Sequence, residues 1–398
     1  MIFLILILIV IFSFAFSSKI NGVYLTPLSI YTISFLLPSA INIFTDNPEV
    51  ILADWLYLVI ISAWFCFFIA YVLTMYFFGY CDSKIKIDNI ICLESIFNKN
   101  FYTKTLFLTV ISIFSTLICL YFVYTEFGFN FYSSGRDYEL VFGKYSFINY
   151  IYYTNLLVII LSSVGIYLSK DHNRAYQFIR AISLLQCILN GQKSLIIIAI
   201  LFSFYAKYLI QIKFKFSQFL YIFLSVVFIF FLVTLLRNSG DTESISFEYL
   251  FYIIESYITY NYKNLQNIIY YDYHDISGLP FVGYYDKFIN VLSGNFNSIS
   301  VYTDLYDTTY YLENEGFNVI TYLGPLYKSY GGLFGIFFGT FIIGVSSSYF
   351  YFKFYKSPSI FLLILNVIFL TVISLSFSAF EFYRLQFWYI VLLTLLLF

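Results

Sequence analysis

Four basic side chains form the first group of residues that could do chemistry. They are Arg136, Arg237, Arg384 and Lys193. The planar guanidinium of arginine matches the oxygens of a phosphate or diphosphate, and it keeps its charge throughout the physiological pH range. We therefore expect the three arginines to bind phosphate groups, with Lys193 as a further candidate. The alternative for each is an ordinary interfacial cation that pairs with a lipid phosphate or a carboxylate.

His274 and Glu315 are the candidate bases. A histidine titrates near neutral pH and can take a proton from a reacting hydroxyl, and a carboxylate can do the same. Glu313 is a rival of similar weight, and a loop histidine without a role is the alternative for His274. The acidic pairs in 272–275 and 304–307 could bind a divalent ion. The sequence contains no clustered metal-ligand motif, however, and we predict neither a metal site nor a cofactor.

The composition indicates where these residues must be held. The chain has 398 residues, of which 61% are hydrophobic and only 11% are charged, whereas soluble domains carry about 25% charged residues. The apolar runs are continuous and close to helix length, without the alternation of membrane strands. We predict an all-α polytopic membrane protein with about 11 (10–12) transmembrane helices. The net charge of −1 gives no reason to expect a nucleic-acid partner.

The apolar runs place the predicted spans, and one loop between them is much longer than the others. The spans are 2–16, 22–45, 52–78, 105–125, 148–168, 177–191, 194–211, 217–236, 331–352, 358–379 and 385–398. The pair around Gly191 and Lys193 could be two tight spans or one broken helix. The predicted division is a bundle of about eight spans over 1–236, a large outer loop over 237–330 and three spans over 331–398.

The distribution of lysine and arginine gives the predicted orientation. Met1–Phe16 resembles a signal-peptide core but lacks its basic flank, so we interpret it as an uncleaved first span. With the N-terminus outside, 13 of the 21 basic residues lie inside and 8 lie outside. Positively charged loops favour the cytoplasmic side. Four of the eight outer basic residues fall in the long loop, which can translocate regardless of its charge. The preference of basic residues for the inner side is therefore stronger than the 13-to-8 count suggests.

The long outer loop, Arg237–Tyr330, is acidic and aromatic. It carries 11 acidic and 4 basic side chains and 17 of the 42 tyrosines. Residues 247–262 have the pattern of a helix in the membrane interface, with an apolar face opposite Glu248, Glu255 and Thr259. That apolar face comprises Leu250, Ile253, Ile254, Tyr257 and Ile258. The alternative is a twelfth span.

Glycine recurs every four residues where the next span begins, at Gly331, Gly335 and Gly339. Small residues at this spacing allow two helices to approach closely. We therefore predict a packing role for all three and no chemical role.

Three short stretches resemble the Wzy-type O-antigen polymerases, which polymerise oligosaccharide repeat units of bacterial envelope polysaccharides. Tyr24-Leu-Thr-Pro-Leu-Ser-Ile-Tyr31 resembles an early span of that family, and Asn190-Gly-Gln-Lys193 resembles its glycine-plus-basic turn. The stretch 316–332 resembles the end of its large periplasmic loop. There, Ser329 stands where an acidic residue is expected.

The resemblance implies an enzyme of the bacterial inner membrane. Such an enzyme transfers a growing glycan from undecaprenyl diphosphate to the next lipid-linked repeat unit at the periplasmic face, which would make the long loop a large periplasmic loop. It implies that Arg136, Arg237, Arg384 and Lys193 hold the diphosphates. His274 or Glu315 would be the base. A chain-length regulator and a flippase of the same pathway are the protein partners it suggests.

Two other functions share this architecture. A flippase or transporter of lipid-linked oligosaccharide would use the same membrane and substrate, but ionisable groups inside the spans are scarce and no internal repeat is evident. An O-antigen ligase would differ only in its acceptor. The sequence does not distinguish the ligase from the polymerase.

Overall fold

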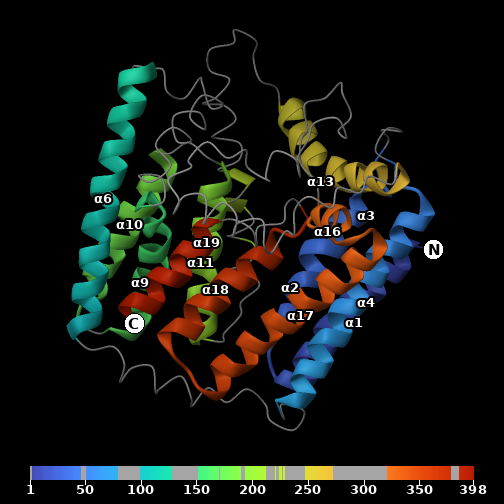
Figure 1. Ribbon diagram of the computed structural model, residues 1–398, viewed down its shortest axis with the longest axis horizontal. Helices are drawn as coiled ribbons and strands as arrows, with labels where there is room; N and C mark the ends of the chain where they lie inside the picture. The colour runs from blue at the N-terminus through green and yellow to red at the C-terminus, as the bar shows by residue number, and fades with distance from the viewer. Residues whose placement is uncertain are drawn as a thin grey trace. The chain divides into compact units, whose positions relative to one another are not determined.

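The computed structural model of the chain describes most of its length. The described ranges are 2–45, 51–78, 99–127, 151–169, 171–189, 193–211, 247–271, 321–377 and 385–398, with single positions between 220 and 228. Within them, every regular element is a helix (Figure 1). The all-helical expectation is therefore confirmed for this part of the chain.

Within the described ranges, four helices are long and apolar enough to cross a membrane. They are α1 (Ile2–Asn21), α4 (Asp54–Phe77), α6 (Lys99–Phe127) and α17 (Leu333–Lys356). Shorter apolar helices accompany them: Pro27–Ile41, α9 (Thr154–Leu168), Ser194–Ile210 within α11 (Lys193–Gln211), α18 (Ile360–Ser374) and Phe387–Leu397 within α19 (Leu385–Leu397). These are the helices of a membrane protein. The count of eleven spans stays a prediction, because most of 217–236 lies outside the described residues.

Helix α6 has the inverted polarity of a helix in lipid. Its outward face is apolar: Leu106, Phe107, Val110, Phe114, Leu117 and Tyr121 are all exposed. Its inward face is lined by hydroxyls, and each bonds a carbonyl about one turn earlier, as Thr109 Oγ1 does to Thr105 O at 2.7 Å and Thr116 Oγ1 to Ser112 O at 2.8 Å. A helix in water would turn its apolar face inward, whereas in lipid the polar groups must be satisfied inside the protein.

The helices form two compact units, and each gathers segments from distant parts of the chain. Unit 1 comprises Met1–Lys86, Phe251–Lys353 and Val372–Leu385, and unit 2 comprises Ile87–Leu250, Phe354–Thr371 and Gln386–Phe398. These units are defined by contacts, whereas the predicted division at 236 and 330 concerns the sides of a membrane. That division stays a prediction.

Unit 2 is built around α9, which packs against α6, α10 (Asn173–Leu189) and α11. All twelve residues from Thr154 to Gly165 are buried. Asn155 Nδ2 donates to Ser183 O of α10 at 2.9 Å, and Gly165 leaves room for the ring of Tyr176, which an added Cβ would meet at 2.6 Å. Helix α10 lies where the span 177–191 is predicted, but it carries Arg174 and is not among the apolar helices.

In unit 1 the second predicted span is one irregular helical stretch. It consists of α2 (Pro27–Tyr31), the π-helix η1 (Thr32–Leu36) and α3 (Leu37–Ile41). Thr26 begins it with a capping box: its hydroxyl accepts from Ser29 N, and Ser29 Oγ accepts from Thr26 N. The π-turn directly precedes Pro38, which has no N–H to donate and whose ring would clash with the carbonyl of Ser34 in a regular helix.

Close approaches at two glycines hold α17 in unit 1. A Cβ on Gly344 would lie 2.8 Å from Ala70 Cβ and 3.2 Å from the Phe67 carbonyl oxygen of α4. A Cβ on Gly339 would lie 2.6 Å from Leu326 in the short helix α16 (Leu323–Tyr330). The predicted packing role is therefore confirmed for Gly339. It is wrong for Gly331, which precedes α17 and ends α16 with a left-handed φ of 83°.

Helix α13 (Phe247–Tyr270) lies across the ends of the helices of unit 1 rather than alongside them (Figure 1). The predicted helix is confirmed and runs eight residues beyond 262. Thr259 was expected on the polar, outward face; instead it is 1% exposed, because this turn packs against the protein and its hydroxyl is satisfied by Glu255 O at 2.9 Å. Although α13 has 24 residues, it is not among the described helices apolar enough to cross a membrane.

At each end of unit 1, the contacts join segments that the predicted orientation places on the same side of the membrane. At one end Phe3 packs on Phe44 at 4.7 Å, and Tyr322 N donates to Ser376 O at 3.1 Å; all four residues are predicted outside or at the outer ends of spans. At the other end Phe78 packs on Tyr349 at 5.0 Å, near the predicted inner side. The contacts thus agree with the order of crossings in this unit.

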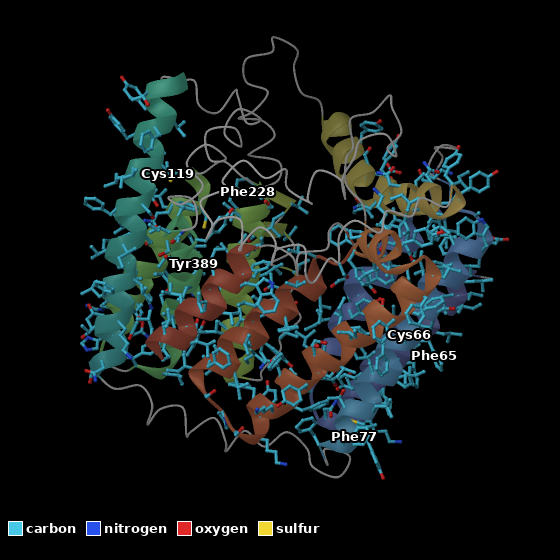
Figure 2. The ribbon with its side chains drawn as sticks, in the orientation of Figure 1. Phe65, Cys66, Phe77, Cys119, Phe228 and Tyr389 are labelled. Atoms are coloured by element: carbon cyan, nitrogen blue, oxygen red, sulfur yellow. The ribbon has the colours of Figure 1, made fainter. Side chains whose placement is uncertain are left out.

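The helices of unit 1 expose large apolar side chains. Phe65 and Phe77 of α4, both labelled in Figure 2, are 53% and 79% exposed. The neighbouring Cys66 is only partly exposed, and α1 likewise exposes Leu4 and Leu8. Such contiguous apolar surface is expected where lipid, not water, is the solvent.

Candidate functional site

Five of the six predicted site residues lie outside the described residues: Arg136, Arg237, His274, Glu315 and Arg384. The sixth, Lys193, is the first residue of α11, where the structure describes the backbone. A helix N-terminus favours anions rather than a cation, so Lys193 lies where a phosphate and not the ammonium would be stabilised by the helix. The assignments of all six residues stay predictions.

Within the described residues, three tyrosines and a threonine form a buried cluster, which we call the tyrosine cluster: Tyr31, Tyr262, Tyr322 and Thr340. The hydroxyls of Tyr31 and Tyr322 hydrogen-bond to each other, and that of Tyr322 also bonds Thr340 Oγ1 at 2.8 Å. Tyr262 donates to the carbonyl of Phe35. All three tyrosines are almost fully buried, at 0–3% exposure.

Aromatic packing fixes the rings of the tyrosine cluster. Tyr31 stacks on Phe67 of α4 with ring centroids 4.1 Å apart. Phe35 lies between the others, 5.2 Å from Tyr322 and 6.0 Å from Tyr262 in edge-to-face and tilted geometries. Four segments that are distant in sequence (η1 with α2, α4, α13 and the start of α16) therefore meet around one set of rings.

Burial determines what these hydroxyls can do. It raises the pKa of Tyr322, a shift that the bonds from Thr340 and Tyr31 only partly oppose, and it raises the pKa of Tyr262 well above its ordinary value. Both phenols therefore stay protonated at neutral pH. They can donate hydrogen bonds and fix positions, but they cannot serve as general bases.

Four hydrogen bonds between Glu255 and Gln266 join α13 to the residues that precede α4. Asn42 Nδ2 donates to Thr259 O at 3.1 Å, and Lys263 Nζ donates to Ile51 O at 3.0 Å. One turn further on, Gln266 Oε1 accepts from Ala53 N at 2.7 Å, which satisfies the first N–H before α4. At the other end of this region, Thr45 bonds the carboxylate of Glu255 at 3.0 Å.

The cluster joins two of the three stretches on which the family resemblance rests. Tyr31 ends the stretch 24–31, and Tyr322 lies in the stretch 316–332; the bond between them spans 291 residues of sequence. Sequence reasoning did not predict this pairing. The third stretch, 190–193, lies outside the described residues except for Lys193.

Lys328 is the residue of this region that sequence reasoning missed. It was counted among the outer basic residues, but it is 2% exposed and lies in the last turn of α16. The available signal was its place inside the stretch 316–332, three residues before the glycine pair Gly331–Gly332 that ends the helix. Across the described ranges, no group of three or more His, Cys, Asp and Glu side chains lies close enough to hold a metal ion.

Comparison of the chain with profiles of known protein families, with curated proteins and with solved structures finds no match in any of the three.

Proposed function

We propose that the chain is a polymerase that joins oligosaccharide repeat units carried on undecaprenyl diphosphate at the periplasmic face of the bacterial inner membrane. The observation that carries the proposal is the bond between Tyr31 and Tyr322, because it brings two separately recognised stretches of the resemblance into one buried cluster. Chance similarity of two short stretches gives no reason for them to meet.

The reaction needs few groups because diphosphate is already a good leaving group. The hydroxyl at the non-reducing end of the acceptor unit attacks the anomeric carbon of the donor glycan. The glycosidic bond forms, the bond to the diphosphate oxygen breaks, and the hydroxyl proton passes to a base. In this proposal His274 or Glu315 is the base. Arg136, Arg237, Arg384 and Lys193 stabilise the charge that develops on the departing diphosphate.

The long acidic loop and α13 suit this reaction for a physical reason. The acceptor is a neutral or charged glycan in water, whereas its diphosphate lies at headgroup depth. An enzyme for both needs structure on the outer face directly beside the membrane. Helix α13, which lies across the ends of the unit 1 helices (Figure 1), supports the proposal in this respect.

The first test is the glycan ladder of cells from which the gene has been deleted. We expect the surface glycan to shrink to core plus a single repeat unit, since polymerisation alone would be lost. Loss of even the one-unit band would instead indicate a flippase or a ligase. An unchanged ladder would contradict all three functions.

Arg237 provides the residue-level test of the same proposal. Arg237→Ala in the complemented strain should abolish long chains while the protein stays in the membrane, because removing one charge-stabilising donor costs about 10²- to 10³-fold in rate. Arg237→Lys, which keeps the charge but not the planar fork, is the matched control and should restore part of the ladder. Normal chain lengths in the alanine variant would refute the assignment of Arg237.

A further inference from the structure

Lys328 is the one buried cation among the charged side chains that the structure describes. An ammonium removed from water loses several kcal/mol of solvation unless other groups compensate. It has interactions within the protein, and its position in the last turn of α16, beside the carbonyl end of the helix, favours a positive charge. These features stabilise a positive charge at a buried position, which an apolar side chain would fill without losing solvation.

Two hydroxyls lie buried beside the start of the same helix. Thr321 is 0% and Ser376 is 3% exposed, and neither hydroxyl has a hydrogen-bond partner in the part of the chain that the structure describes. The bond from Tyr322 N to Ser376 O, at 3.1 Å, holds the two residues' segments together. A buried hydroxyl without a partner costs about 1–3 kcal/mol, so a group that bonded both hydroxyls would recover that cost.

Helical spacing relates the hydroxyl of Thr321 to Lys328. The helical turn begins at Thr321, whose carbonyl accepts from Gly324 N at 3.0 Å. Helix α16 begins at Leu323, two residues after Thr321, so about two helical turns, or about 10 Å along the axis, separate Thr321 from Lys328. A cation and two hydroxyl donors are the groups that bind phosphate oxygens.

We propose that Lys328, with the hydroxyls of Thr321 and Ser376, binds a phosphate group of a lipid diphosphate at the predicted outer end of unit 1. This inference rests on the proposed function and adds a phosphate-binding residue to it. Helix α16 directly precedes α17, whose first residues lie at the predicted outer surface, so the site has the depth of a lipid headgroup. Tyr322, the residue before α16, bonds Tyr31 and Thr340 and so joins the start of this helix to the tyrosine cluster.

The test measures binding of undecaprenyl diphosphate to the purified full-length protein in phosphatidylcholine nanodiscs. We expect Lys328→Met to weaken binding by about 10- to 100-fold, the value of a hydrogen bond to a charged group, and Lys328→Arg to keep it within about threefold. Thr321→Val and Ser376→Ala should each weaken it by about threefold. Lys263→Met is the matched control, because Lys263 is a partly buried lysine of α13 that bonds a backbone carbonyl, and it should leave binding unchanged.

The outcomes separate this inference from the proposed function. If the wild-type protein does not bind undecaprenyl diphosphate, both fail. If it binds and Lys328→Met binds equally well, only the inference fails. If Lys328→Met does not fold, the two hydroxyl variants decide, because neither hydroxyl has a described partner to lose; unchanged binding in both overturns the site.

Competition distinguishes the source of the phosphate. In this assay the bound undecaprenyl diphosphate carries a label. Excess inorganic phosphate or phosphatidylglycerol should displace it at least tenfold less well than unlabelled undecaprenyl diphosphate does. Equal displacement by inorganic phosphate would identify a general anion site. Equal displacement by phosphatidylglycerol would identify a structural phospholipid site. Either result would overturn the assignment to the substrate.

Discussion

At the scale of single residues, the hydroxyls of Tyr31, Tyr322 and Thr340 connect the second predicted span, the end of the long loop and α17. All three side chains are buried, at 0–3% exposure, so their hydroxyls depend on one another for hydrogen bonds. Removing the hydroxyl of Tyr322 deprives both Tyr31 and Thr340 of a bond, whereas removing the hydroxyl of Tyr31 leaves Tyr322 bonded to Thr340. Removing both phenolic hydroxyls removes the need for the bond between them. This asymmetry can be measured.

We expect Tyr31→Phe and Tyr322→Phe each to lower the free energy of unfolding by about 1–2 kcal/mol, with Tyr322→Phe the larger because Tyr322 has two hydroxyl partners. The double variant should cost less than the sum by about 0.5–1.5 kcal/mol. Unfolding by sodium dodecyl sulfate would measure the free energy of unfolding of the wild-type protein, the two single variants and the double variant. Thr154→Val, which removes a hydroxyl bonded at 3.0 Å to Tyr389 in unit 2, is the control and should be additive with both. Strict additivity of the two tyrosines would refute a direct bond.

At the scale of elements, the two glycines of α17 differ in what they face. The neighbour of Gly339 is the flexible end of the Leu326 side chain, whereas Gly344 faces Ala70 Cβ and the backbone of Phe67. A side chain can rotate away from an added methyl group, but backbone in the middle of α4 cannot move without shifting a helix. The same substitution should therefore have unequal costs.

We predict that Gly344→Ala lowers the free energy of unfolding by about 1–3 kcal/mol, the range for overpacking a filled core. Gly339→Ala should cost less than half as much, because Leu326 can change rotamer and alanine favours the helix by about 1 kcal/mol. Detergent unfolding of both variants would provide the comparison. Equal costs, or a larger cost at Gly339, would mean that α4 and α17 do not approach closely at Gly344.

The elements also indicate what a sequence can reveal about such a chain. The long apolar runs predicted α1, α4, α6 and α17 closely, since in lipid the length and polarity of a helix are set by the solvent. The sequence pattern does not reveal the extension of α13 past 262, because the buried face there is short and mixed: Asn264, Leu265 and Ile268 are its buried side chains, and a buried asparagine has no signature in hydropathy.

The candidate site was less predictable than the spans. Residue type and side of the membrane selected Arg237 and His274, and Lys328 was passed over because a lysine in an acidic loop is ordinarily exposed. The bond between Tyr31 and Tyr322 crosses 291 residues and depends on tertiary packing alone. A pattern in one sequence carries no signal for a pairing at that separation.

At the scale of the whole molecule, unit 1 constrains the topology of the residues between its segments. Phe78 at the end of α4 lies beside Tyr349, near the end of α17. At the opposite end, Thr340 in the first half of α17 meets the tyrosine cluster, and α13 bonds Asn42 and Ala53. The chain must therefore leave α4 on one side of the membrane and return to α17 on the other, which requires an odd number of crossings between them.

The five spans predicted over 105–236 satisfy this requirement for an odd number of crossings. If 177–211 were one broken helix, there would be four crossings and the requirement would fail unless α13 itself crossed. The structure of unit 1 thus favours two spans, or none, around Gly191.

Reactive cysteines can test this parity together with the orientation. The chain has Cys81 and Cys92 in the loop predicted to be cytoplasmic, while Cys66, Cys119 and Cys187 lie in helices of the two units. In intact cells a membrane-impermeant maleimide should not label Cys81 or Cys92, and it should label a cysteine introduced at the exposed Glu255 of α13. Permeabilised cells, in which all three positions should react, are the control. Labelling of 81 or 92 together with protection of 255 would reverse the orientation. Labelling of both sets in intact cells would contradict the odd number of crossings, because the end of α4 and α13 would then lie on the same side.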